Sequence, residues 1–169
     1  MPVYRGGSLE DAFPDEEIWR YLALVGEGLR HLHLNSVLHR DLKPGNVLLG
    51  TTAYDLVITD FGLAKVVPAG QMAKSDLGTP GAKAPEVHEG REYGPPADVW
   101  SLGALGYRLA TGSFPPARAI TPEDLPGRDR RLQDAILGLL KYEVFDRLSL
   151  DQLLAIPDAH VHVLQSARI

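Results

Sequence analysis

Apolar residues recur at helical spacing early in the chain, and this pattern predicts a helix from Asp15 to about Leu34. The apolar face of this helix would consist of Ile18, Tyr21, Leu22, Val25, Leu29 and Leu32. Three short apolar runs follow, each bounded by Gly, Pro, Asn or Asp, and they predict short strands separated by loops. These runs are Val37–Leu38, Val47–Leu49 and Leu56–Ile58.

The second half of the chain favours helices separated by long loops. Residues 62–96 are rich in glycine and proline with little periodicity, which predicts a long ordered loop of the kind that carries function. Residues 97–110 are apolar on nearly every face, as in a helix buried at the centre of a domain. After another loop over 112–127, shorter helices are expected around Leu132–Leu140 and Leu150–Ala155. The order of elements predicts a mainly α fold with a small β element.

Composition and charge narrow the class of protein. The 169 residues fit one compact domain, and 44% apolar with 23% charged residues is ordinary for a globular protein. A formal charge of −5 does not favour nucleic-acid binding, and the absence of cysteine excludes disulfides and thiolate chemistry. Neither a signal peptide nor a membrane-spanning run is visible in the sequence. We therefore expect a soluble intracellular protein, in the cytoplasm or nucleus, without nucleic-acid or membrane partners.

Residues 39–46, HRDLKPGN, place several ionisable side chains in one short bend. Asp41 lies between Arg40 and Lys43, whose positive charges favour its ionised form. A carboxylate in such a loop can orient a hydroxyl and accept its proton. Asn46 and, further on, Asp60 offer oxygen ligands of the kind that magnesium prefers. A base, a cation and two magnesium ligands together indicate phosphoryl transfer.

Four motifs extend this interpretation to a known family. HRDLKPGN, ITDFGLAK, GTPGAKAPE and DVWSLG, in this order and spacing, resemble the C-terminal lobe of a eukaryotic-type protein kinase. Lys43, two residues after Asp41, resembles the serine/threonine branch. The resemblance assigns 1–169 to this lobe, with 1–7 as a hinge remnant, 39–46 as the catalytic loop, 60–86 as the activation segment and 97–110 as the central helix. It implies transfer of the γ-phosphoryl group of ATP, with Mg2+, to Ser or Thr residues of proteins.

The resemblance also implies a role for individual residues. Asp41 would be the catalytic base and Lys43 would contact the γ-phosphate, while Asn46 and Asp60 would hold magnesium. Leu48 would lie beneath the adenine, and the backbones of Pro2 and Tyr4 would face it. His39 and Phe61, followed by Gly62, would belong to an apolar stack between the lobes. Asp98 would accept hydrogen bonds from the catalytic-loop backbone, and Glu86 would pair with Arg147.

In the activation segment, two residues resemble family residues with a role, and one pair differs from the family pattern. Ser75 stands where such kinases often carry a phosphorylated residue, and a phosphate there would pair with Arg40 and Lys65. Thr79 resembles the threonine that hydrogen-bonds the catalytic aspartate. Ala82 and Lys83 replace the usual aromatic and apolar pair, which changes the pocket for the residue after the acceptor.

At its beginning the chain resembles the hinge between two kinase lobes. Met1-Pro2-Val3-Tyr4 followed by GGSL matches that hinge, and the glycine-rich loop and strand lysine of an N-terminal lobe are not in the sequence. We therefore expect the N-terminal lobe to be absent, the chain alone to be weak or inactive, and a kinase N-terminal lobe to be a partner in cis or in trans. Apolar surface around Leu48 and Phe61 would then be exposed.

Other interpretations of these residues remain open at this stage. Asp41 and Asn46 could be turn residues, Asp98 a helix cap, and Glu86 and Arg147 separate surface charges. The histidine pairs His31/His33 and His160/His162 lack an acidic or cysteine cluster and are expected to be solvated or packed. Two alternative functions are a non-catalytic interaction module and a small-molecule phosphotransferase.

Overall fold

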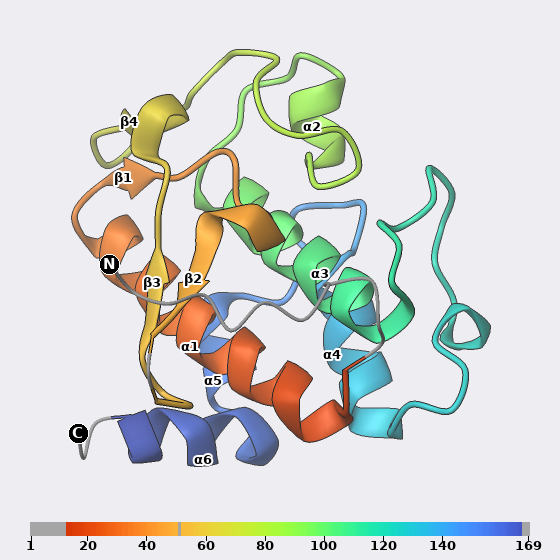
Figure 1. The fold of residues 1–169 in the computed structure, drawn as a ribbon. Coiled ribbons are helices and arrows are strands. Elements are labelled where there is room, and N and C mark those ends of the chain that lie inside the picture. Colours follow the sequence, from red (N-terminus) through yellow and green to blue (C-terminus); the bar gives the residue numbers. More distant parts are fainter. Residues whose placement is uncertain (1–12, 51, 167–169) are drawn as a thin grey trace.

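The computed structural model describes residues 13–50 and 52–166 of the chain. Helices form the body of the structure, and short strands lie along one side of it (Figure 1). The helices are α1 (Asp15–Leu34), α2 (Pro85–His88), α3 (Pro95–Thr111), α4 (Arg130–Leu139), α5 (Leu150–Leu154) and α6 (Pro157–Ser166). Short 3-10 turns span Pro44–Asn46, Phe61–Leu63 and Pro122–Asp124. A mainly α fold with small sheets, as the sequence predicts, is confirmed.

Helix α1 occupies the range predicted from its apolar spacing. Its first turn carries Asp15, Glu16 and Glu17, and negative charges are favourable at the N-terminal end of a helix dipole. Beyond its end at Leu34, the side-chain amide of Asn35 donates a 2.8 Å hydrogen bond to the carbonyl of His31. The cap therefore satisfies a carbonyl that has no partner within the helix.

Helix α3 is the buried centre of the structure. It begins at Pro95, two residues before the predicted start, because proline is favoured at the first position of a helix. It ends at Thr111, and the next residue, Gly112, has a φ of 79°, the left-handed conformation that glycine tolerates. A Cβ on Gly103 would lie only 2.7 Å from the Cβ of Leu139, so this glycine allows α4 to approach closely.

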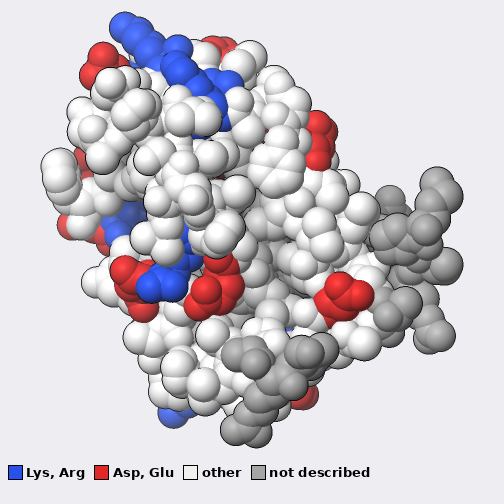
Figure 2. All heavy atoms as spheres, turned by 90° about the vertical axis from the view of Figure 1, so that its left-hand side faces the viewer, with Lys and Arg blue, Asp and Glu red and all other residues white. Residues whose placement is uncertain are grey.

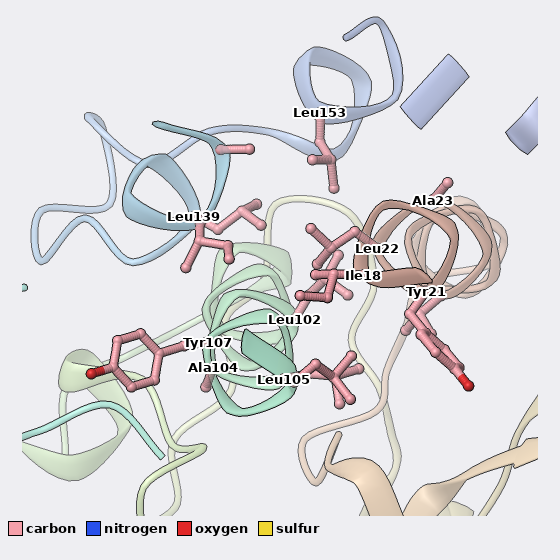
Figure 3. Close-up of a cluster of buried hydrophobic side chains, with 14 of the residues drawn as sticks. Ile18, Tyr21, Leu22, Ala23, Leu102, Ala104, Leu105, Tyr107, Leu139 and Leu153 are labelled. Atoms are coloured by element: carbon pink, nitrogen blue, oxygen red, sulfur yellow. The ribbon is translucent and has the colours of Figure 1, made fainter. Parts of the chain in front are cut away.

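The core lies between α1, α3, α4 and α5. Ile18 and Leu22 of α1 point toward Leu102 and Leu105 of α3, as Figure 3 shows. Leu139 of α4 and Leu153 of α5 close the same cluster from other directions, and both are fully buried. Helix α6 packs on α1 as well. This core fixes α1 and α3, which carry the segments of the candidate site.

Two antiparallel strand pairs flank the helices. β1 (Val37–Leu38) pairs with β4 (Lys65–Val66), with Val37 opposite Val66. β2 (Val47–Leu49) pairs with β3 (Leu56–Ile58), with Val47 opposite Ile58. The bend at 39–46 connects β1 to β2, and Asp60 follows β3. The pairing therefore brings the two ends of the candidate site together.

Two parts of the helix prediction need correction. Residues 62–96 form an ordered series of loops, but they also contain β4 and α2. The short helix α2 begins at Pro85, and at four residues it is too short to show a periodic apolar pattern. Helix α6 does not follow from the sequence pattern either, because its buried residues are only Ala159 and His162. Among the described residues, no helix is both long and apolar enough to cross a membrane.

Candidate active site

The bend at 39–46 is held against α3 by one carboxylate. Asp98 is 1% exposed and accepts hydrogen bonds from the backbone N–H groups of His39 (2.9 Å) and Arg40 (2.8 Å). The structure thus makes the backbone contact expected of Asp98, and Nε2 of His33 lies 2.9 Å from the same carboxylate. Arg40 has a φ of 69°, a conformation that is unfavourable for a residue with a side chain. The Asp98 contacts stabilise the bend in that conformation.

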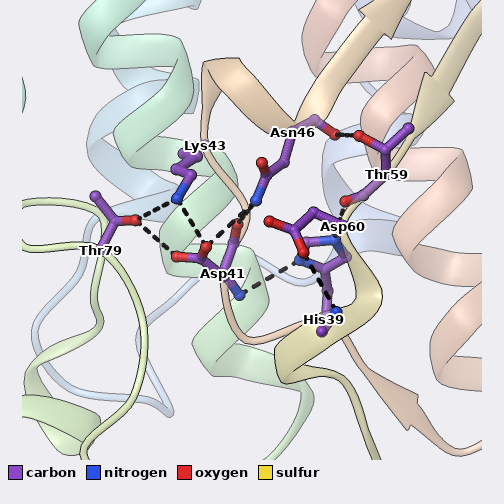
Figure 4. Close-up of polar contacts among 8 residues, drawn as sticks. His39, Asp41, Lys43, Asn46, Thr59, Asp60 and Thr79 are labelled. Carbon is purple, nitrogen blue, oxygen red and sulfur yellow. Dashed lines mark hydrogen bonds and ion pairs between the residues drawn. The ribbon is translucent and has the colours of Figure 1, made fainter.

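Asp41 lies at the centre of a polar network (Figure 4). The hydroxyl of Thr79 donates to its Oδ1 at 2.7 Å, and Nζ of Lys43 donates to its Oδ2 at 2.8 Å. Lys43 also donates to the hydroxyl of Thr79 at 3.0 Å. Burial alone would raise the pKa of Asp41, but the hydrogen bonds from Lys43 and Thr79 and the charge of Lys43 together lower it. Asp41 is therefore a carboxylate at neutral pH.

Asn46 and Asp60 present oxygen atoms near this carboxylate (Figure 4). The side-chain amide N–H of Asn46 donates to the backbone carbonyl of Asp41 (2.8 Å), which leaves its Oδ1 for other ligands. The backbone N–H of Thr59 donates to the carbonyl of Asn46 (2.8 Å) and ties the two segments together. Asp60 is exposed, has a φ of 61° and caps the turn 61–63 through the N–H of Gly62.

These oxygens fit a magnesium ion. Magnesium in nucleotide sites takes one or two protein oxygens, with the remaining positions filled by phosphate oxygens and water. The amide oxygen of Asn46 and the carboxylate of Asp60 supply such a pair, fixed by the backbone contacts around Thr59. Among the described residues there is no cluster of three or more His, Cys, Asp or Glu that would hold a metal on its own. The donor set therefore suits a metal that arrives with phosphate.

His39 and Phe61 lie together beneath this site. Their rings meet edge to face, with centroids 5.3 Å apart. His39 is completely buried, and its Nε2 lies 2.9 Å from the carbonyl oxygen of Thr59, whereas Phe61 is 48% exposed. Leu48 is half-buried on β2. Pro2 and Tyr4, expected near the adenine, lie outside the described residues.

Residues 60–86 return to the bend at 39–46 through Ser75 as well as Thr79. The hydroxyl of Ser75 lies 2.6 Å from the hydroxyl of Tyr93 and accepts a 3.2 Å hydrogen bond from Nη1 of Arg40. Arg40 also donates through Nε to the carbonyl of Leu63. Among the described residues, Lys65 makes no polar contact with Ser75, although both were expected at a phosphate site.

Glu86 and Arg147 form a buried, bidentate ion pair. Nη1 and Nη2 of Arg147 contact the two carboxylate oxygens of Glu86 at 2.7 and 3.0 Å. Their side chains are 1% and 3% exposed, with Arg147 the more buried. Arg147 also donates to the carbonyls of Pro96, Lys141 and Tyr142 and lies over the ring of Trp100. The pair joins α2 to the segment before α5.

The sequence did not single out Tyr93 or assign His33 to this site. Tyr93 is 2% exposed and bridges Ser75 and Arg40, but no motif around it indicates a polar role. His33 was expected to be solvated or packed, and its spacing on α1 gives no sign of a contact with Asp98. Both contacts join segments far apart in the chain, so only the folded structure reveals them.

Sequence comparison places the chain in a known family. A sequence model of the family described as "Protein kinase domain" matches residues 4–157. The chain belongs to the protein kinase domain family. The match covers the bend, the activation segment and the Glu86–Arg147 pair, so the resemblance found in the four motifs is confirmed.

Kinase relatives share these sequences over part of their length. The chain is 44% identical over 101 residues to SNF1-related protein kinase catalytic subunit alpha KIN12 of Arabidopsis thaliana, which covers 60% of the chain and 20% of that protein. It is 36% identical over 126 residues to serine/threonine protein kinase OSK3 of Oryza sativa subsp. indica, covering 74% and 24%. It is 47% identical over 91 residues to human calcium/calmodulin-dependent protein kinase type IV, covering 53% and 19%. The chain thus spans about a fifth to a quarter of these relatives.

Proposed function

We propose that this chain forms the C-terminal lobe of a serine/threonine protein kinase and contributes the catalytic residues for transfer of the γ-phosphoryl group of ATP to a protein hydroxyl. The observation that carries the proposal is the network around Asp41, in which Thr79, Lys43 and Asn46 all contact one ionised carboxylate. The names of the similar proteins, which are serine/threonine kinases, support the same class of reaction.

Each residue of the network has a chemical task in this reaction. Asp41 orients the acceptor hydroxyl, whose oxygen attacks the γ-phosphorus while the bond to the bridging oxygen of ADP breaks. The hydroxyl proton passes to Asp41. Because the pKa of Asp41 is lowered, the carboxylate is a weak base, and transfer of the proton occurs only as bonding to phosphorus makes the hydroxyl more acidic. Lys43 stabilises charge on the transferred group.

Asn46 and Asp60 would hold magnesium, and the ion supplies charge neutralisation for the phosphate oxygens when bound. The fixed position of Asn46 supports this role, since its amide N–H groups already bind Asp41 and only the oxygen remains for a metal. Leu48, half-buried on β2, would pack against the adenine.

An apolar hollow supports a second lobe as partner. Leu24, Gly28 and Leu32 of α1, residues 56–58 of β3 and Phe61 line it. Val57 and Phe61 are 53% and 48% exposed, although both are large apolar residues. On the side of the molecule that carries β1, β3 and β4, charged residues lie in small groups and most of the surface is uncharged (Figure 2). We infer that a kinase N-terminal lobe, in the same polypeptide or another, packs on the hollow.

The test is phosphate transfer from labelled ATP with magnesium to a serine peptide. One arm uses the chain alone and the other uses the chain joined to the N-terminal lobe of a related kinase. We expect transfer in the joined protein, because the second lobe adds the glycine-rich loop and lysine that kinases require. No transfer in either arm, together with tight binding of a kinase lobe, would instead support a non-catalytic interaction module. Transfer to small alcohols but to no peptide would indicate a small-molecule phosphotransferase.

Phosphorylation of Ser75 is the regulatory part of the proposal. Its hydroxyl already contacts Arg40 and Tyr93, so a phosphate would lie beside the Arg40 guanidinium and form charge-assisted hydrogen bonds. We expect phospho-Ser75 to raise the rate of the joined protein. Ser75→Ala should remove that increase, while Ser113→Ala, in an exposed loop, should keep it. An unchanged rate in Ser75→Ala after treatment with an activating kinase would contradict this role.

A further inference from the structure

A partly buried lysine lies in the activation segment next to the proposed acceptor position. The side chain of Lys83 is 14% exposed, whereas the side chain of its partner Asp76 is 66% exposed. Nζ of Lys83 donates a 2.6 Å hydrogen bond to Oδ1 of Asp76. Among the described residues this is the one polar contact of the ammonium group, and a lysine has three N–H donors. Two donors therefore remain for a ligand.

The stem of Lys83 runs beside the residue that precedes Thr79. A Cβ placed on Gly78 would lie 3.7 Å from Cγ of Lys83 and 2.7 Å from the carbonyl oxygen of Arg40. Thr79 in turn lies 2.7 Å from Asp41. An acceptor hydroxyl must come within about 2.6–3.2 Å of Asp41, and one residue of extended peptide spans about 3.3–3.6 Å. The stem of Lys83 therefore lies beside the segment that carries Thr79, which contacts Asp41.

Hydrogen bonds hold this part of the segment in place. The backbone N–H of Ala82 donates to the carbonyl of Thr79 at 3.1 Å, which closes a turn. The hydroxyl of Ser101 on α3 donates to the carbonyl of Ala82 at 2.8 Å. Lys83 and Arg40 are the basic residues that line the hollow between this segment and α3. The backbone that leads to Lys83 is thus held in place, and the side chain of Lys83 is only 14% exposed.

We propose that Lys83 selects protein substrates that carry an acidic side chain directly beside the Ser or Thr acceptor. The inference rests on the proposed function and names its substrate class. A carboxylate of the substrate approaches the free donors of Lys83. Because the Lys83 side chain is partly buried, water and salt screen this ion pair less. A neutral side chain at the same place forms no such pair.

Asp76 modulates this preference. Asp76 is on the surface and neutralises Lys83 when no substrate is present. Its negative charge therefore weakens the attraction between Lys83 and an acidic substrate. Replacing Asp76 by asparagine leaves the ammonium charge without its internal partner. The preference for an acidic substrate therefore increases in Asp76→Asn and is lost when Lys83 itself is replaced.

The experiment measures peptide binding to the full chain by calorimetry or NMR titration. Serine peptides are made in matched pairs that differ only by Glu or Gln, directly after the serine in one pair and directly before it in the other. We expect the Glu peptide of one pair to bind about three- to ten-fold more tightly, the range of a modest ion pair. The ratio of the two affinities, Glu peptide to Gln peptide, should fall to about one in Lys83→Met and persist in Lys83→Arg.

Two further variants control for charge. Lys141→Met removes the same charge from an exposed position between α4 and α5 and should keep the wild-type ratio. Asp76→Asn should increase the ratio of Glu-peptide to Gln-peptide affinity. The proposal is overturned if Glu and Gln peptides bind equally in both pairs, if Lys83→Met keeps the preference, or if Asp76→Asn abolishes it.

A separate assay distinguishes this inference from the proposed function. Phosphate transfer to the Gln peptide by the joined protein tests kinase activity and does not depend on acidic selectivity. Transfer with equal binding of the two peptides would contradict the role of Lys83 alone. Lys83-dependent selectivity without transfer would contradict the kinase function alone.

Discussion

At the scale of single residues, the carboxylate of Asp41 shows how the fold selects one protonation state. Its burial favours the neutral acid, but Lys43 and Thr79 both donate hydrogen bonds to it and Lys43 adds a positive charge. The result is a lowered pKa and a base that is ionised well below neutral pH. A folded-state pKa below the ordinary value stabilises the protein above that value, and the stabilisation is lost as pH falls through the folded pKa.

Replacing Lys43 by methionine should raise the pKa of Asp41. The variant removes the largest lowering interaction, the hydrogen bond from Lys43, together with the charge of Lys43, while the burial that opposes them remains. Carboxyl NMR of the labelled chain measures this pKa directly. Lys141→Met serves as a control for the loss of one charge. If the pKa of Asp41 does not rise in Lys43→Met, Lys43 does not determine the ionisation of Asp41.

The motifs predicted the members of this site but not all of their contacts. Asp41, Lys43, Asn46 and Thr79 were expected together from the spacing of short motifs, and the structure places them in one network. Tyr93 could not be found this way, because its role depends on the fold bringing it to Ser75 and Arg40. A residue that acts only through long-range contacts leaves no local pattern in the sequence.

At the scale of elements, a buried ion pair joins α2 to the segment before α5. Glu86 and Arg147 are almost completely buried, and Arg147 satisfies three backbone carbonyls in addition. A buried charge that loses its partner is strongly destabilising. The pair therefore fixes α2, at the end of residues 60–86, against the segment before α5.

Arg147→Met should lower the free energy of unfolding by about 3–5 kcal/mol, because the carboxylate of Glu86 is then left buried and unpaired. Urea unfolding measures the loss. Arg91→Met, which breaks the exposed Arg91–Glu89 pair, should cost less than about 1 kcal/mol. The double variant Glu86→Leu/Arg147→Met should recover part of the stability. Equal costs for Arg147→Met and Arg91→Met would contradict the importance of the pair.

A buried histidine makes the packing of α6 sensitive to acid. Among the described residues, Nδ1 of His162 is buried without a hydrogen-bond partner, and burial lowers the pKa of the ring. Its neutral form is therefore favoured in the folded state. This stability is present above the ordinary pKa of 6.5 and is lost as pH falls from there toward the lowered folded value.

His162→Leu should reduce the loss of stability between pH 7.5 and pH 5.5, since it removes a group that binds a proton more readily in the unfolded than in the folded state. Chemical unfolding at both pH values measures the difference. The neighbouring exposed His160 provides the control, and His160→Leu should keep the wild-type pH dependence. The same pH dependence in His162→Leu and wild type would show that acid acts elsewhere.

At the scale of the whole molecule, the helical body positions two chain segments against one carboxylate. Helix α3 holds the bend at 39–46 through Asp98 and residues 60–86 through Ser101. The apolar pattern predicted the long helices α1 and α3, because α1 carries apolar residues at helical spacing and α3 is apolar on nearly every face. It did not predict α2 or α6, which are short or bury few residues, so their positions follow from tertiary packing.

The central claim is that Asp41 is the base of a phosphoryl-transfer site, and the turnover number of Asp41→Asn tests it most directly. In the chain joined to a kinase N-terminal lobe, with MgATP and a serine peptide, we expect kcat to fall by roughly 10²–10⁴ while KM for both substrates changes little. Asp134→Asn, at an exposed position on α4, should keep the wild-type kcat. An Asp41→Asn protein that retains kcat within a few-fold of wild type would contradict the account.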